Sequence, residues 1–75
     1  MDLDDAIVLT LTDAGEPLHW TVIQDRLLRA GHLDPFVAGG PRRAVLRTLA
    51  DLADRGAIVN GPGKGVYAAA DAQGR

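Results

Sequence analysis

The chain contains neither cysteine nor serine, and these absences exclude several kinds of chemistry. Without cysteine there is no disulfide framework and no thiolate metal site, and a reducing compartment is the simplest setting. Without serine there is no serine nucleophile. Neither His19 nor His32 has a carboxylate or a second histidine at metal-ligand spacing, and no two carboxylates are placed for acid–base work. We therefore expect no metal, cofactor, small-molecule substrate or catalytic activity.

Long apolar runs are also missing. No run approaches the roughly 20 residues that a membrane-spanning helix needs. The first residues, Met1 to Asp5, are acidic where a signal peptide would be basic. These features predict a cytoplasmic protein with no membrane partner.

Positive charge is scarce and unevenly distributed. The formal net charge is −2, yet residues 1–25 carry six acidic residues and no basic one, whereas residues 26–75 carry eight basic and four acidic residues. The first segment is thus −6 and the second +4. A net negative charge argues against nonspecific binding to nucleic acid, but this asymmetry permits one basic face.

Aromatic residues are few, so leucine, isoleucine and valine must build the core. The length of 75 residues allows one domain, expected over residues 1–70, with residues 71–75 as a flexible tail. Apolar residues recur at helical spacing in three segments. The expected helices cover residues 3–14, about 21–30 and 41 to about 55.

Glycine and proline mark the ends of these helices. Gly15 and Gly31 follow the first two, while Gly40 and Pro41 open the third as N-cap and first helical residue. In the loop between the second and third helices, the side chains of Leu33 and Phe36 are expected to be buried and to anchor the loop to the core. Three short runs are expected to be extended, namely residues 17–20, 57–60 and 66–69.

The glycine-rich segment 61–65 lies between the last two extended runs and is suited to a hairpin turn. It is not a phosphate-binding P-loop, because Gly65 and a strand follow Lys64 where that loop has Ser or Thr and a helix. The order helix, short strand, helix, helix, hairpin predicts the α+β winged helix-turn-helix fold, with the hairpin as the wing.

Two motifs resemble the HARE-HTH family, a group of winged-helix domains found in chromatin regulators and restriction endonucleases. The first is Gly15-Glu16-Pro17-Leu18-His19-Trp20, followed by Ile23; the second is Gly65-Val66-Tyr67. Between them, the arginine-led third helix and residues 55–58 keep the family's spacing. The resemblance covers about residues 3–69 and implies DNA binding or a role in transcription complexes.

A DNA-binding surface is the leading functional hypothesis. Arg43 and Arg47 lie on the outward side of the third helix, Arg42 is in its first turn, and Lys64 is at the tip of the wing. Basic residues at a helix N-terminus oppose the helix dipole, and a phosphate of double-stranded DNA would offset that cost. The alternative is a solvated face, on which Arg47 pairs with Asp51 and Asp51 with Arg55. His19 is expected to form a hydrogen bond with backbone at the start of the second helix.

A protein–protein adaptor is the second hypothesis. Val8 and Leu9 lie off the buried stripe of the first helix, close to Asp5 and Thr12. These four residues are either scattered surface positions or the docking face for a protein partner or a second copy, without DNA binding.

Overall fold

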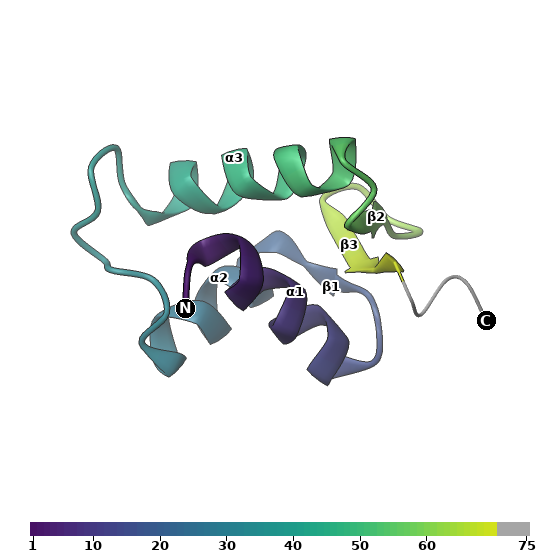
Figure 1. Cartoon of the computed structure of the whole chain (residues 1–75), viewed down its shortest axis with the longest axis horizontal. Helices are drawn as coiled ribbons and strands as arrows, with labels where there is room; N and C mark the ends of the chain where they lie inside the picture. Colours follow the sequence, from purple (N-terminus) through teal and green to yellow (C-terminus); the bar gives the residue numbers. More distant parts are fainter. Residues whose placement is uncertain (71–75) are drawn as a thin grey trace.

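Three helices and one small antiparallel sheet make up the part of the chain that the structure, a computed structural model, describes (Figure 1). Residues 1–70 are described, and the tail expected at 71–75 lies outside them. No helix among the described residues is long and apolar enough to cross a membrane. The elements in chain order are α1 (Leu3–Ala14), β1 (Leu18–His19), α2 (Trp20–Ala30), α3 (Pro41–Asp54), β2 (Ile58–Asn60) and β3 (Val66–Ala69).

The ends of the first two helices follow from local sequence. Asp2 caps α1, because its side chain accepts a hydrogen bond from the backbone N–H of Asp5 at 2.9 Å. Gly15 ends α1 in the left-handed conformation, with φ +68°. Residues with a side chain adopt this conformation at an energetic cost, whereas glycine does not. The helix α2 begins at Trp20, one residue earlier than expected, because His19 takes the N-cap position.

The sheet has the strand order β1–β3–β2, so β3 pairs with both of its neighbours. Leu18 lies opposite Tyr67, and Ile58 lies opposite Ala69. Beyond the last β1–β3 pair, the backbone N–H of Trp20 donates to the carbonyl of Gly65 at 2.9 Å. The hairpin of β2 and β3 is therefore attached to the start of α2.

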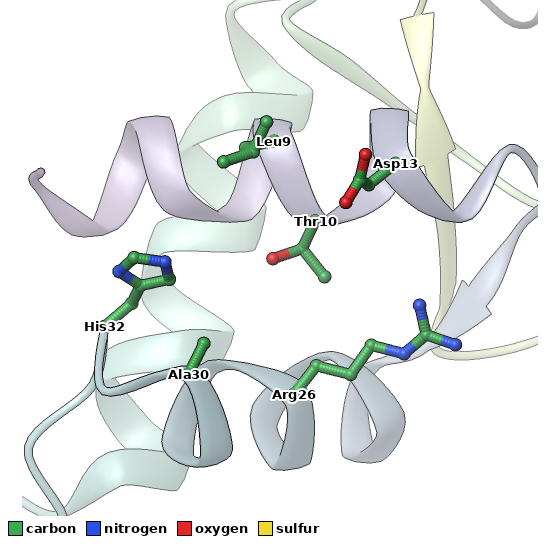
Figure 2. Close-up of a pocket in the computed structure, with 6 residues that line it drawn as sticks. All are labelled: Leu9, Thr10, Asp13, Arg26, Ala30 and His32. Atoms are coloured by element: carbon green, nitrogen blue, oxygen red, sulfur yellow. The ribbon is translucent and has the colours of Figure 1, made fainter.

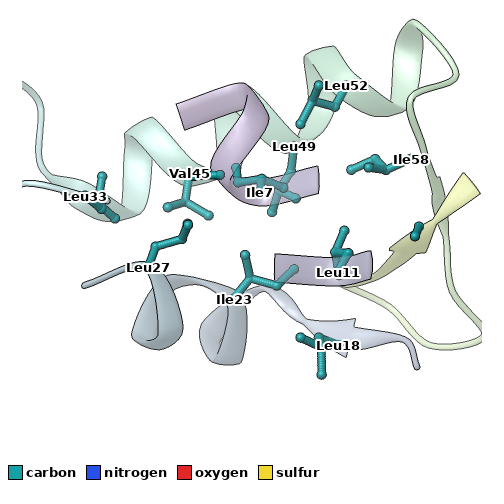
Figure 3. Packing of buried hydrophobic residues seen from close by; sticks show 12 residues of the cluster. Ile7, Leu11, Leu18, Ile23, Leu27, Leu33, Val45, Leu49, Leu52 and Ile58 are labelled. Atoms are coloured by element: carbon teal, nitrogen blue, oxygen red, sulfur yellow. The ribbon is translucent and has the colours of Figure 1, made fainter. Parts of the chain in front are cut away.

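The core lies where the three helices meet the sheet (Figure 3). Ile7 and Leu11 of α1 point toward Leu49 of α3 and Ile23 of α2, and all four are buried. Leu18, Ile58 and Ala69 bring the sheet to the same cluster, and Ala68 is buried as well. Leucine, isoleucine and valine supply the largest buried side chains, which confirms the expectation from composition.

The loop between α2 and α3 differs from expectation at one anchor. Leu33 is buried, with 5% of its surface exposed, but Phe36 is 90% exposed. The carboxylate of Asp34 accepts a hydrogen bond from the Phe36 N–H at 2.9 Å, and its carbonyl accepts one from Val37 N–H at 3.1 Å. This tight turn directs Val37 against the core in place of Phe36. The prediction that Phe36 is buried is wrong.

Gly65 offers a test of how closely the hairpin approaches α2. A Cβ atom at Gly65 would lie 3.1 Å from both His19 Nε2 and Trp20 Cδ1, and φ there is +75°. At Gly15 the φ is similar, +68°, but no atom lies within 4 Å of that position. We expect Gly15→Ala to lower the free energy of unfolding by about 1 kcal/mol, the backbone cost alone. Gly65→Ala should lower it further, because it adds a steric clash.

Chemical denaturation of both variants measures this difference. Equal losses of stability at the two positions would contradict the close packing of the hairpin against His19 and Trp20.

Candidate nucleic-acid interface

The buried stripe of α3 determines which of its charged residues face outward. Val45, Leu49 and Leu52 are buried against the core. At 100° per residue, positions 43 and 47 then lie on the opposite side of the helix. Both arginines are exposed, and neither takes part in an ion pair among residues 1–70. The first half of α3 therefore presents to solvent two guanidinium groups that have no carboxylate partner in the described part of the chain.

Asp51, the acidic residue one turn beyond Arg47, is paired with another residue. Asp51 pairs with Arg55 at 3.2 Å, and Arg55 also pairs with Asp4 of α1 at 2.6 Å. The expected Asp51–Arg55 pair is thus present, but the alternative pairing of Arg47 with Asp51 does not form within the described chain. Arg55, which also contacts α1 through Asp4, therefore balances the negative charge of Asp51.

Asp54 is the acid that shares the outward side with the two arginines. It is exposed and lies seven residues beyond Arg47, about 10 Å along the helix axis at 1.5 Å per residue. That separation is close to the Debye length at physiological ionic strength, about 8 Å. The outward face of α3 is therefore basic in its first half and acidic only at its C-terminal end.

Arg42 and Arg43 are adjacent in sequence but lie in different surroundings. The guanidinium carbon of Arg42 is 5.4 Å from the centroid of the Trp20 ring, a cation–π arrangement that joins α3 to the start of α2. Arg43 instead lies beside the loop, where a Cβ atom on Gly39 would be 3.2 Å from its Cδ. Trp20 thus holds Arg42 toward the base of the hairpin.

His19 and Trp20 complete this surface, and sequence reasoning gave them no binding role. The expected hydrogen bond is confirmed, because His19 Nδ1 accepts from the backbone N–H of Thr21 at 3.2 Å. The His19 and Trp20 ring centroids are 5.8 Å apart. Lys64 is exposed and precedes Gly65, where an added Cβ atom would lie 3.1 Å from each of the two rings. No local pattern indicates this cluster, because its members come from three parts of the chain.

The outer face of α1 is a separate surface. Asp5, Leu9 and Thr12 are exposed, and Leu9 has 45% of its surface free. Val8 is half-buried and packs against the core, so it contributes less exposed surface to this face than Leu9 does. The helical repeat turns it toward the core edge rather than outward with Leu9.

A shallow pocket of about 190 Å³ lies between α1 and α2 (Figure 2). Its residues are Leu9, Thr10, Asp13, Arg26, Ala30 and His32. The Thr10 hydroxyl already donates to the Ala6 carbonyl at 2.7 Å. Within the described chain, no group of three or more His, Cys, Asp or Glu residues is placed to hold a metal ion.

Comparison with protein-family models, with curated proteins and with solved structures finds no match for this chain. The HARE-HTH resemblance stays a prediction based on the two motifs quoted above.

The Arg42–Trp20 contact can be measured with a double-mutant cycle. We expect Arg42→Met and Trp20→Leu to be coupled by about 0.5–1 kcal/mol, the usual strength of an exposed cation–π pair. A cycle of Arg43→Met with Trp20→Leu serves as control and should show no coupling, because Arg43 lies beside Gly39. Equal coupling in the two cycles, from urea denaturation, would contradict the assigned contact.

Proposed function

We propose that this chain is a winged-helix module that binds double-stranded DNA. In this proposal α3 lies in or against the major groove, and the β2–β3 hairpin is the wing. Arg43 and Arg47 contact the duplex from α3, Arg42 contacts it at the edge of that helix, and Lys64 reaches the backbone from the wing. The helix order and the strand order β1–β3–β2 support the winged-helix assignment.

The separation of charges on α3 is the observation that carries the proposal. Arg43 and Arg47 have no carboxylate partner among residues 1–70, whereas Asp51 is neutralised by Arg55 on another flank. Unpaired, outward arginines are suited to phosphate oxygens and to base edges in the major groove.

The start of α3 adds a second feature that favours an anion. Gly40 supplies no side-chain cap, and Pro41 occupies the first turn. The first turn therefore has backbone N–H groups without a capping side chain, next to Arg42 and Arg43. A DNA phosphate at this end would satisfy those donors and offset the unfavourable interaction of both arginines with the helix dipole.

The resemblance of the Pro17-Leu18-His19-Trp20 run and of the Gly65-Val66-Tyr67 ending to HARE-HTH domains supports the same proposal. In the structure these two motifs are adjacent, because Leu18 pairs with Tyr67 and His19 with Val66. The motifs therefore define one structural unit at the base of the hairpin.

DNA binding is tested by fluorescence anisotropy with a labelled duplex at low salt. We expect Arg43→Ala/Arg47→Ala to weaken binding about tenfold or more, because each lost phosphate or base contact reduces affinity. The slope of log K against log salt concentration should fall by about 0.9 for each phosphate contact removed. Arg29→Ala is the control: it removes one positive charge where the double variant removes two, and Arg29 is paired with Asp25 on α2 at 2.8 Å. Per charge removed, it should weaken binding less than the double variant does.

If Arg43→Ala/Arg47→Ala loses no more affinity than Arg29→Ala, α3 is not part of the DNA interface. If the wild-type protein binds no duplex at all, the exposed Leu9 and the pocket between α1 and α2 become the candidate surface for a protein partner.

The two acids of α3 provide an independent prediction. Asp54→Asn should strengthen duplex binding about two- to fivefold, because it removes an unpaired negative charge from the outward face. Asp51→Asn should have a smaller effect, since Arg55 already balances that charge. The same anisotropy measurement compares the two variants, and an equal or larger gain from Asp51→Asn would count against the assigned orientation of α3.

A further inference from the structure

We propose that the pocket between α1 and α2 binds a free α-amino acid with a small, uncharged side chain. The inference does not depend on DNA binding, because the residues that line the pocket include none from α3 or from the hairpin. The amino acid is a ligand in this proposal and not a substrate, so no bond is made or broken.

Two opposite charges line this pocket without neutralising each other. Asp13 belongs to α1 and Arg26 to α2, and Figure 2 shows both at the same end of the pocket. Both residues are exposed, and neither takes part in an ion pair among residues 1–70. One end of the pocket therefore offers a carboxylate and a guanidinium group to a ligand.

Together these two groups select a ligand that carries both charges. A guanidinium group can hold a carboxylate through two parallel hydrogen bonds, and a carboxylate accepts hydrogen bonds from an ammonium group. Asp13 would repel a simple organic acid, and Arg26 would repel a simple amine. An α-amino acid carries its ammonium and carboxylate groups on one carbon atom, so it can satisfy both residues at once.

The other lining residues determine which side chain the ligand has. Leu9 and Ala30 contribute apolar surface, and His32 lies at the opposite end from the charged pair (Figure 2). The Thr10 hydroxyl donates its hydrogen to the carbonyl of Ala6 at 2.7 Å, so its oxygen can still accept a bond from the ligand. An uncharged side chain against Leu9 and Ala30 leaves no charge of the ligand unpaired.

The volume of the pocket limits the ligand to a small molecule. It is about 190 Å³, below the roughly 300 Å³ at which pockets for drug-sized ligands begin. Valine, leucine and threonine combine the required head group with a short, uncharged side chain. These three amino acids are therefore the probes for this site.

Titration of the ¹⁵N-labelled chain with each L-amino acid, followed by NMR at neutral pH, tests the proposal. We expect at least one of them to shift the amide signals of Thr10, Asp13 and Ala30 in a saturable way. The Kd should be about 1 mM or lower, an affinity within reach of so small a ligand. The signals of Arg47 and Gly65 should stay in place, because neither residue lines the pocket.

Two analogues of the amino acid that binds best test the need for both charges. The matching amine lacks only the carboxylate, and the matching carboxylic acid lacks only the ammonium group. For leucine these are 3-methylbutylamine and 4-methylpentanoate. Each should bind at least about tenfold more weakly than the amino acid, because each loses one charge-assisted interaction.

Substitutions in the protein remove the same two interactions from the other side. Arg26→Gln and Asp13→Asn should each weaken binding of the amino acid about tenfold. Arg29→Gln and Asp5→Asn are the matched controls and should bind like wild type, because they remove the same charges from α2 and α1 outside the pocket. All four residues are exposed, so the substitutions should preserve the fold.

The proposal is wrong if none of the three amino acids gives saturable shifts at concentrations up to about 20 mM, well above the expected Kd. It is also wrong if the singly charged analogues bind as tightly as the amino acid, or if Arg26→Gln and Asp13→Asn bind like wild type. None of these results bears on duplex binding by α3, which the anisotropy measurement tests separately.

Discussion

The rotation of α3 about its own axis is the constraint on which the account of function depends. Val45, Leu49 and Leu52 are buried among the side chains of α1, α2 and β2, and they leave the helix one way to pack. A helix turned by one position would expose a leucine and bury a charged residue, at a cost of several kcal/mol. Core packing therefore directs Arg43 and Arg47 outward, so the surface chemistry is a consequence of the apolar pattern.

The same packing explains how an acidic protein can present a basic surface. The net charge is −2, but the acids of the first 25 residues belong mainly to α1 and the segment that follows it. Among residues 1–70, the ion pair that joins the acidic helix to α3 is Asp4–Arg55, at the far end of α3 from Arg42 and Arg43. Charge is thus separated in space, and a local field rather than the net charge would guide a polyanion to the molecule.

Local sequence predicted the elements well and the long-range contacts poorly. Gly15, Gly31 and Pro41 act within a few residues of themselves, and the expected helices agree with the structure to within one residue. Phe36 was misplaced because a turn at Asp34 decides which of two neighbouring apolar residues faces the core. The cluster around Gly65 could not be predicted, since it needs the hairpin to pack against α2.

The most direct test of the account is a titration of the ¹⁵N-labelled protein with a short duplex at low ionic strength, followed by NMR. The account predicts that the amide signals of Arg43, Arg47 and Gly65 shift together and that the shifts are lost at high salt. The signals of Leu9 and Thr12 on the outer face of α1 should stay in place. Unmoved signals on α3 and the hairpin, or shifts confined to α1, would contradict it.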